Sequence, residues 1–431
     1  MTTSQYFDAT QFINQESLPS AFAKLNLNEQ STINSPLIHR FFRQQFITLF
    51  KGIDDGFIKL NDPLNSITFG DHDNELKCEI TIYDLSSYTR IALGGSNGSA
   101  QAYIDGLWSS DNPTTLVRIL VRNRDILNSM ESGLSSVAQT LCKVWHSFNR
   151  NSKQGSKKNI AAHYDLGNDF FKLFLDKRMM YSSGLYQGGD DLESASQRKL
   201  KRICNTLNLC ENDHVIEIGS GWGGFACFAA KTTGCKITTV TISKEQYSEA
   251  LSQVKRQGLE KNVSVQLQDY RDIKGQYDKL VSIEMIEAVG HQYIDVYFDK
   301  INSLLKDNGT ALIQSIVIDD AQYQRALKEV DYIKRYIFPG SFIPCYDIIS
   351  KTAKQSGLAI NEIFDMGLSY AQTLRDWRKL FYQNLDQIKA QNYDAEFLRM
   401  WEFYLCYCEG GFDEQAISVG QISFSKKPFN S

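Results

Sequence analysis

Two closely spaced glycines at the end of an apolar run have the pattern of a ligand-binding turn. The stretch VIEIGSGWGG (215–224) places Gly219 and Gly221 directly after a short strand-like segment. Glycine has no Cβ, so a turn built from it can approach a ligand that a side chain would otherwise block. Glu217 stands at the carboxyl end of the same predicted strand, where open α/β sheets bind their ligands. The pattern predicts a loop that binds an adenosine-containing ligand.

A second pair of residues narrows the identity of that ligand. A glycine-rich turn alone is weak evidence, because nicotinamide and flavin enzymes use one too; here Trp222 interrupts the crowded turn of the dinucleotide pattern. Further along, QDYRD (268–272) places Asp269 and Tyr270 at a second carboxyl end. An acidic side chain beside an aromatic face suits an adenine ring, through a hydrogen bond to its amino group and through stacking. Taken singly, Asp269 could be a helix cap and Tyr270 a packing residue, but the two in this order favour S-adenosylmethionine.

The composition is that of a folded globular protein. Of the 431 residues, 42% are apolar and 22% are charged, and the length suits two compact units. A formal net charge of −4 gives no sign of a dedicated nucleic-acid partner, and we expect none. The nine cysteines include one close pair, Cys406 and Cys408, whose spacing fits neither a zinc site nor a redox motif. We therefore expect free thiols and no metal site.

Alternating strand-like and helix-like segments must position the candidate residues. Short apolar or β-branched runs recur from residue 213 onward, and helix-like segments such as 223–234 and 244–259 separate them. Strands joined by helices of this length form a parallel sheet that helices cover on both faces. The predicted strands lie within 213–220, 235–243, 263–270, 277–289, 310–318 and, directly after a helix, 415–427.

The first third of the chain predicts a separate, smaller α+β unit. Apolar residues recur at helix-like intervals in the first 60 residues, and the pattern between Ile67 and Tyr88 is strand-like. Helices are expected within 93–108 and 112–127, the second of which begins with Asn-Pro-Thr, a helix-start signal.

A polar, basic stretch, NRNSKQGSKKN (149–159), has no apolar periodicity and is typical of a linker. It divides the chain into an N-terminal domain (1–148) and a second domain (160–431). No secretory signal and no apolar run of roughly 18 residues is visible, so we expect a cytoplasmic protein. The three lysines of the linker either favour anionic lipid headgroups or merely keep the linker solvated.

Seven segments, taken in order, carry a resemblance to a known family. They are AHYDLGNDFFKLFLDKRMMYSSGLY (162–186), VIEIGSGWGGFA (215–226), VTISKEQ (240–246), LQDYRD (267–272), DKLVSIEMIEAVGHQY (278–293), YIFPG (336–340) and MWEFYLCYCEGGF (400–412). With them, nearly the whole chain resembles the cyclopropane-fatty-acyl-phospholipid synthase family, and AYIDGLW (102–108) is similar to that family's accessory domain. The form of SIEMIEAVGHQY, with glutamine in LIQSI (312–316), is similar to the branch with plant-type and many proteobacterial members.

The resemblance implies both a fold and a reaction. The fold would be a Rossmann-like class I methyltransferase sheet (α/β) with a helical lipid-binding insertion, plus the small N-terminal α+β domain. The substrates would be membrane phospholipids with cis-unsaturated acyl chains, reached peripherally at the inner face of the membrane. S-adenosylmethionine would be the methylene donor, and a bicarbonate ion held in the active site would be the base. A homodimer is a further expectation.

The resemblance also implies roles for individual residues. In addition to Glu217, the cofactor contacts would be Tyr181, Ser182, Gly219, Gly221, Thr241, Ile242, Gln246, Asp269 and Tyr270. The catalytic, bicarbonate-holding residues would be Ser183, Glu287, Gln314, Ile316 and Tyr370. Three positions depart from the commonest bacterial pattern: Ser183 replaces cysteine, Gln314 replaces histidine, and Ala288 replaces the histidine that follows the glutamate. Glutamine donates a hydrogen bond as histidine does but cannot titrate, so we expect the base to be retained.

The chemistry of an unactivated alkene places demands on the pocket. Methyl transfer leaves a carbocation on the acyl chain, and loss of a proton from the new methyl closes a ring, whereas deprotonation elsewhere gives a methylene or methyl branch. Water must be excluded, and aromatic faces can stabilise the cation. The expected aromatic lining is Tyr164, Tyr181, Tyr336, Phe338 and Tyr370.

Two glutamates compete for the catalytic role in IEMIEAVG. We expect Glu287 to act and Glu284 to be an ordinary helix-surface glutamate. An intact Glu287 and an intact glycine loop argue against a catalytically silent lipid-binding protein. The N-terminal domain and the YIFPG segment argue against a methyltransferase for small molecules.

Overall fold

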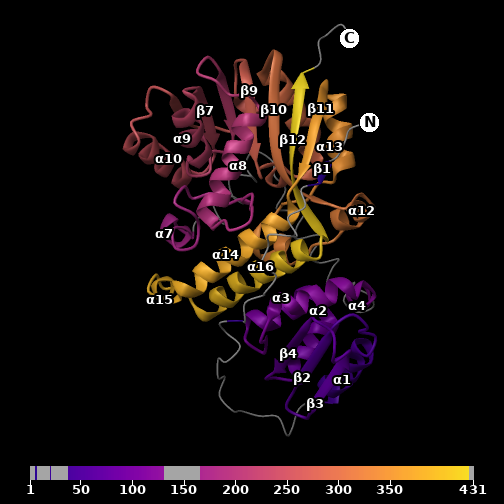
Figure 1. The fold of residues 1–431 in the computed structure, drawn as a ribbon. Helices are drawn as coiled ribbons and strands as arrows, with labels where there is room; N and C mark the ends of the chain where they lie inside the picture. The colour runs from indigo at the N-terminus through magenta and orange to yellow at the C-terminus, as the bar shows by residue number, and fades with distance from the viewer. Residues whose placement is uncertain (1–4, 7–19, 21–36, 131–165, 427–431) are drawn as a thin grey trace.

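An eight-stranded sheet forms the larger unit of the computed structural model, which describes residues 5–6, 20, 37–130 and 166–426 (Figure 1). The strand order is β1-β11-β12-β10-β9-β6-β7-β8. Strand β12 runs antiparallel to both of its neighbours, and the other pairs are parallel. The strands are β1 (Gln5–Tyr6), β6 (His214–Ile218), β7 (Lys236–Thr241), β8 (Val263–Leu267), β9 (Tyr277–Ile283), β10 (Leu305–Ile318), β11 (Leu358–Asp365) and β12 (Ile417–Lys426).

Helices cover both faces of this sheet, as the sequence predicts. Helices α8, α9 and α10 pack on one face, where their apolar side chains meet Val215 of β6 and Ile237 of β7. Helices α11 and α13 pack on the other face against Ile216 and Val240, because successive side chains of a strand point to opposite faces. The bounds are α8 (Leu192–Thr206), α9 (Gly224–Thr233), α10 (Lys244–Arg256), α11 (Ile294–Leu304) and α13 (Tyr346–Gln355), with the short turns α7 (Asn168–Phe171), η1 (Tyr270–Asp272), η2 (Ile286–Ala288) and η3 (His291–Tyr293).

All six predicted strands are present, and two others were not predicted. The sequence analysis did not identify β11, whose LAINEIFD lacks a clean alternation, or the two-residue β1. Between β6 and β9 the chain order of the strands reverses direction across the sheet. Open α/β sheets bind ligands at such a switch point, beyond the carboxyl ends of the strands.

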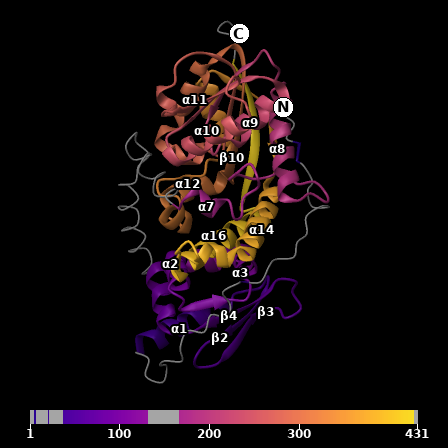
Figure 2. The ribbon, with the colours of Figure 1, turned by 90° about the vertical axis from the view of Figure 1, so that its left-hand side faces the viewer.

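A helical layer leaves the sheet between β11 and β12 and lies between the sheet and the N-terminal unit (Figures 1 and 2). It consists of α14 (Gly367–Gln383), α15 (Leu385–Lys389) and α16 (Ala395–Asp413). A second insertion follows β10 and contains α12 (Asp320–Lys328) and the π-helix η4 (Ile333–Ile337). These are the helical insertions that the resemblance implied. Among the described helices, none has both the length and the apolar character needed to cross a bilayer.

The N-terminal unit is a small α+β structure with the sheet order β3-β2-β4-β5. The sequence predicted helical structure throughout the first 60 residues. Helix α1 ends at Phe50, and the strand β2 begins at Phe57, so the prediction was wrong for the last of these residues. The Asn112 side chain caps α3 by accepting a hydrogen bond from the Thr115 N–H. The elements are α1 (Leu37–Phe50), β2 (Phe57–Asn61), β3 (Ser66–Gly70), β4 (Lys77–Ile82), α2 (Ser86–Ile104), β5 (Trp108–Ser110), α3 (Pro113–Arg122) and α4 (Arg124–Met130). The predicted linker 149–159 and the domain boundary lie outside the described residues.

Two fully buried carboxylates on α16 join the helical layer to its surroundings. Glu402 accepts hydrogen bonds of 2.5 Å from the hydroxyls of Tyr103, in the N-terminal unit, and Tyr382, in α14. Glu409 forms a 2.8 Å ion pair with Arg378, and both side chains are completely shielded from solvent. Arg375 also pairs with Glu409, at 3.1 Å. These charges are stable in the interior only because each has a partner.

Replacing Glu409 with alanine should strongly destabilise the fold. Arg378 would be left buried without its main partner, and breaking a buried pair in this way costs roughly 3–5 kcal/mol of unfolding free energy. The control is Arg256→Ala, which breaks a solvent-exposed pair with Glu249 and should cost less than about 1 kcal/mol. Urea denaturation followed by circular dichroism measures both, and equal losses in the two variants would contradict the assignment.

Candidate active site

A cavity of about 620 Å³ opens at the carboxyl ends of β6 and β9. Its volume is within the range of typical ligand sites. Strand ends and the glycine loop form one part of its wall, while α14, α16 and η4 form another. Apolar residues of the N-terminal unit, such as Trp108, Leu116 and Leu120, complete the lining. The cavity therefore extends from the sheet to the N-terminal unit.

The glycine loop has a backbone that only glycine adopts easily. Gly219 and Gly221 have φ values of 91° and 47°, in the left-handed region. A Cβ on Gly219 would approach the Met285 side chain to 3.0 Å, whereas a Cβ on Gly221 would meet no protein atom within 4 Å. Since Gly221 lines the cavity, the space beside it is available to a ligand. The structure thus places the loop where the sequence predicts a ligand-binding turn.

All ten residues predicted to contact the cofactor lie in the wall of this one cavity. They come from the ends of three strands (β6, β7 and β8), the first turn of α10 and the segment before α8. The Thr241 hydroxyl donates to the Gln246 side-chain oxygen at 3.0 Å, which fixes both beside the loop. The ten are Tyr181, Ser182, Glu217, Gly219, Gly221, Thr241, Ile242, Gln246, Asp269 and Tyr270.

Asp269 and Tyr270 also show the roles that we considered as alternatives. The Asp269 carboxylate caps η1 and accepts hydrogen bonds of 2.9 and 2.7 Å from the Arg271 guanidinium. The Tyr270 ring packs edge-to-face against Tyr297, with ring centroids 5.7 Å apart. Both residues still line the cavity. Their contact with an adenine ring therefore stays a prediction.

Glu217 is an almost fully buried carboxyl at the end of β6. It accepts a 2.5 Å hydrogen bond from the Thr239 hydroxyl. Burial raises the pKa of Glu217 to about 8, because desolvation disfavours the charged form. A positively charged ligand group beside it would favour the carboxylate.

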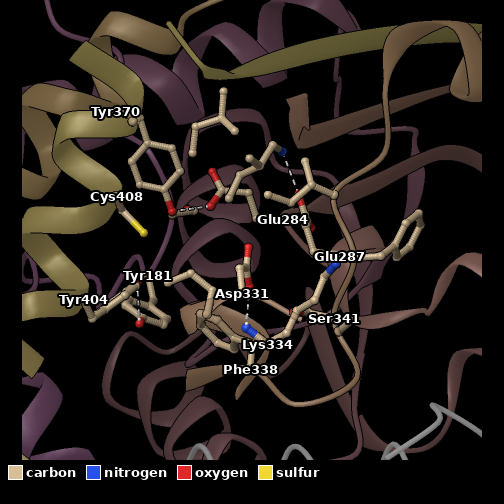
Figure 3. A pocket seen from close by; sticks show the side chains of 18 of the residues that line it. Tyr181, Glu284, Glu287, Asp331, Lys334, Phe338, Ser341, Tyr370, Tyr404 and Cys408 are labelled. Atoms are coloured by element: carbon tan, nitrogen blue, oxygen red, sulfur yellow. Dashed lines mark hydrogen bonds between the residues drawn. The ribbon is translucent and has the colours of Figure 1, made fainter. Parts of the chain in front are cut away.

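Glu287 lies in η2 and lines the cavity close to Glu284 (Figure 3). Its Oε1 accepts hydrogen bonds from the Ile316 N–H at 2.6 Å and the Ser315 hydroxyl at 3.2 Å. Its Oε2 is buried and has no hydrogen-bond partner among the described residues. Burial, together with repulsion from Glu284, raises the pKa of Glu287 to about 8.

Glu284 is the site residue that the sequence analysis missed. We expected it on a helix surface, but it follows β9 directly and its carboxylate faces the cavity (Figure 3). Its Oε1 accepts hydrogen bonds from the Ser183 N–H at 2.9 Å and the Gln314 amide at 2.8 Å. Its Oε2 accepts one of 2.7 Å from the Tyr370 hydroxyl. The expectation was wrong because the chain turns sharply at Glu284, with a φ of 46°, instead of continuing into a helix.

Two of the predicted catalytic residues lie behind the cavity wall rather than in it. Ser183 and Gln314 are completely buried. The Ser183 hydroxyl donates to the Gly184 carbonyl at 2.8 Å, and the Gln314 side-chain oxygen accepts from Gln421 at 3.0 Å. Glu287, Ile316 and Tyr370 do line the cavity. Both residues contact Glu284, which does line the cavity.

Aromatic rings surround the two carboxylates (Figure 3). The Tyr181 ring stacks on Trp377 with centroids 5.3 Å apart, and its hydroxyl lies 2.9 Å from that of Tyr404. Tyr370 packs against Phe412 at 4.4 Å. Of the predicted aromatic lining, Tyr181, Phe338 and Tyr370 border the cavity, Tyr336 does not, and Tyr164 lies outside the described residues.

Comparison with known proteins now places this site in a family. The family model described as mycolic acid cyclopropane synthetase matches residues 151–422. The chain belongs to the mycolic acid cyclopropane synthetase family. This confirms the resemblance seen in the sequence, and with it an enzyme of the S-adenosylmethionine-dependent methyltransferase type.

Individual relatives agree with this assignment. The chain is 35% identical over 342 residues to tuberculostearic acid methyltransferase UfaA1 of Mycobacterium tuberculosis, covering 77% of this chain and 79% of the relative. It is 32% identical over 375 residues to the cyclopropane-fatty-acyl-phospholipid synthase of Escherichia coli K12, covering 86% and 94%. The crystal structure of mycolic acid cyclopropane synthase CmaA1 with SAH and CTAB matches with a TM-score of 0.59 and 26% identity, over 63% of this chain and 98% of that one.

The donors expected to hold bicarbonate do not fit that ion in this member of the cyclopropane synthetase family. The Ser183 N–H, the Gln314 amide and the Tyr370 hydroxyl all donate to the Glu284 carboxylate. The Ile316 N–H donates to Glu287. The Glu284 carboxylate thus accepts the hydrogen bonds that the resemblance assigned to bicarbonate. A bicarbonate ion beside it would be repelled by its negative charge.

Substituting Gly221 with alanine should impair cofactor binding more than stability. The matched control is Gly258→Ala, because Gly258 also has a positive φ, of 67°, and open space around its Cβ, but lies on the exposed α10–β8 turn. Both variants should lose similar stability from backbone strain. Only Gly221→Ala should lose affinity for S-adenosylmethionine, by about tenfold or more, a difference of about 1.4 kcal/mol. Isothermal titration calorimetry and thermal melts measure the two effects, and equal affinities would contradict the placement of the cofactor.

Replacing Glu287 with glutamine should stabilise the protein increasingly as the pH rises. Since the pKa of Glu287 rises from 4.5 to about 8 on folding, the native state binds more protons than the unfolded state between these values. Stability therefore falls as the pH rises through this window. Glutamine does not titrate, so the difference in melting temperature should grow from pH 4.5 to pH 8. Glu260→Gln, at an exposed position, is the control and should show no such trend; a flat difference for Glu287→Gln would refute the prediction.

Proposed function

We propose that this enzyme transfers the methyl group of S-adenosylmethionine to the cis double bond of an unsaturated phospholipid acyl chain and closes a cyclopropane ring. The observation that carries the proposal is the pair of partly buried carboxylates, Glu284 and Glu287, beside an aromatic cavity that is continuous with the glycine loop. A weak acceptor such as an alkene needs a strong electrophile, which the sulfonium methyl supplies. The remaining tasks fall to the protein: to bind, to exclude water and to accept a proton.

The aromatic wall supports a cationic intermediate. Tyr181, Phe338, Tyr370 and Tyr404 present ring faces or edges to the same cavity (Figure 3). Rings exclude water, which would otherwise trap the cation as an alcohol, and their faces attract positive charge. The Glu284 and Glu287 carboxylates line the same cavity, so positive charge developing on the acyl chain would be stabilised by the rings and by the carboxylates together.

The part of the cavity next to the N-terminal unit suits a lipid. Trp108, Leu116 and Leu120 supply an apolar surface for an acyl chain. Arg124 and Arg325 also line the cavity, and guanidinium groups recognise phosphate by charge and by paired hydrogen bonds. We further propose that the enzyme works peripherally at the inner, cytoplasmic face of a membrane, because its substrate would be a membrane phospholipid.

A branched product is the second candidate. The relative named tuberculostearic acid methyltransferase is 35% identical to this chain, and the Glu284 carboxylate accepts the hydrogen bonds that the resemblance assigns to bicarbonate. If the cation instead loses a proton from a neighbouring chain carbon, the product is a methyl-branched alkene. If a hydride first shifts from the methylated carbon to the cationic carbon, loss of a proton from the methyl group gives a methylene branch. All of these products share the methyl transfer that forms the cation.

A cell-free assay distinguishes these products. The full-length protein is incubated with labelled S-adenosylmethionine and phospholipid vesicles that carry cis-monounsaturated chains, and the fatty acids are analysed by mass spectrometry. A gain of one methylene group with no remaining double bond is expected. The same gain with unsaturation retained would overturn ring formation in favour of the branch. Label on soluble acceptors alone would overturn the lipid substrate.

A further inference from the structure

We propose that Glu284 is a built-in base that replaces bicarbonate in this enzyme. The inference rests on the proposed methyl transfer to an alkene and goes beyond it by naming the group that removes the proton. It predicts a reaction that does not depend on bicarbonate. The argument rests on the hydrogen bonds, the backbone and the charges around Glu284.

The hydrogen-bond donors around Glu284 form a site that fits a carboxylate. Three donors, the Ser183 N–H, the Gln314 amide and the Tyr370 hydroxyl, converge on Glu284 at 2.7–2.9 Å. They come from three separate segments of the chain, and none of them is needed to complete a helix or a strand ladder. Carboxylates accept several hydrogen bonds at once, so the set holds an anion in place. It also leaves the side chain with little freedom to move away from the cavity.

The backbone of Glu284 indicates a functional constraint. Its φ of 46° lies in the left-handed region, which glycine adopts freely and glutamate rarely does. Strain of this kind persists where surrounding structure over-determines it, and it clusters at active sites. The Glu284 N–H is fixed by a 2.7 Å hydrogen bond to the Gln314 carbonyl. A glycine would fit this backbone with less strain, so the glutamate side chain must serve another purpose.

The charges around Glu284 favour its ionised form over that of Glu287. Lys199 is completely buried, donates a 2.6 Å hydrogen bond to the Ser182 hydroxyl, and attracts the Glu284 carboxylate. Glu287, in contrast, is repelled by Glu284 and has one oxygen without a hydrogen-bond partner among the described residues. Two neighbouring carboxyls in a poorly solvated site tend to share one proton. Tyr370 and Lys199 bias that proton toward Glu287, so Glu284 remains free to act as a base.

The proton transfer balances without any further reactant. Methyl transfer leaves a neutral thioether and a carbocation on the acyl chain. A Glu284 oxygen then takes a proton from the new methyl group, an O–H bond forms, and the electrons of the broken C–H bond close the ring onto the cationic carbon. Glu284 becomes a neutral acid and returns the proton to solvent before the next turnover. Each cycle therefore releases one proton, as the overall reaction requires.

Bicarbonate dependence tests the inference directly. The vesicle assay is run in buffer freed of carbon dioxide and again with added bicarbonate. The wild-type enzyme should have the same rate in both, and Glu284→Gln should lose about 10²–10⁴-fold in rate while still binding S-adenosylmethionine. Its residual product should contain more methylene-branched or hydroxylated chains, because the cation waits longer for a base. A role in folding alone would not change the product ratio.

A second variant makes the test independent of the first. Glu284→Gly empties the anion position and relieves the backbone strain, so it should be nearly inactive without bicarbonate and regain activity when bicarbonate or formate is added. Asn208→Gly is the matched control, because Asn208 also has a positive φ, of 49°, at an exposed turn; its activity should not respond to either anion. A wild-type enzyme that requires bicarbonate, or a Glu284→Gln variant with unchanged rate and products, would overturn the inference. Absence of labelled lipid from the wild-type enzyme in both buffers would instead overturn the proposed function.

Discussion

The three hydrogen bonds to the Glu284 carboxylate join the sheet, the segment before α8 and the helical layer at one point of the cavity wall. The Ser183 N–H comes from the segment before α8, the Gln314 amide from β10 and the Tyr370 hydroxyl from α14. Each donor could reach a single acceptor only after the sheet and the helical layer had assembled. A buried charge without partners would be prohibitively unfavourable, so these contacts are a condition for having an anion in the cavity at all.

The position of the helical layer is the second constraint on the cavity. The layer α14–α16 supplies the aromatic wall on one side and contacts the N-terminal unit on the other. The buried ion pair between Arg378 and Glu409 and the hydroxyl contacts of Glu402 hold this layer in place. Contacts that lie outside the cavity thus hold part of its wall in place, because α14 carries both Arg378 and the cavity-lining Tyr370.

The desolvated acids of this site lower the free energy of unfolding at neutral pH. Burial raises the pKa values of Glu217, Glu284 and Glu287, because each would be better solvated in the unfolded chain. Folds tolerate such groups where function needs them, and the loss is offset by packing elsewhere. The dense aromatic contacts around Trp377 and Trp401, both almost fully buried, provide part of that packing.

The sequence by itself determined the strands and the glycine loop. Local patterns set both: β-branched alternation defines β6 to β10, and Gly219 and Gly221 mark a turn that other residues would strain. The ten residues predicted to contact the cofactor all line one cavity, and those that follow β6, β7 and β8 meet there because strand ends in a parallel sheet lie along one edge. Strand β11 was missed since its pattern is irregular, and its position is fixed by pairing with β12 far along the chain.

The tertiary structure alone decided the different environments of Glu284 and Glu287. In the sequence, Glu284 and Glu287 are two glutamates that lie three residues apart in the same apolar run. Nothing local distinguishes their roles. Their environments differ because the partners of Glu284 lie 30, 86 and 101 residues away in the chain, and no local pattern encodes such distances. The left-handed backbone at Glu284 likewise depends on contacts that form only on folding. Hydrogen bonding and burial set the charge of a carboxyl group, and both are properties of the assembled fold.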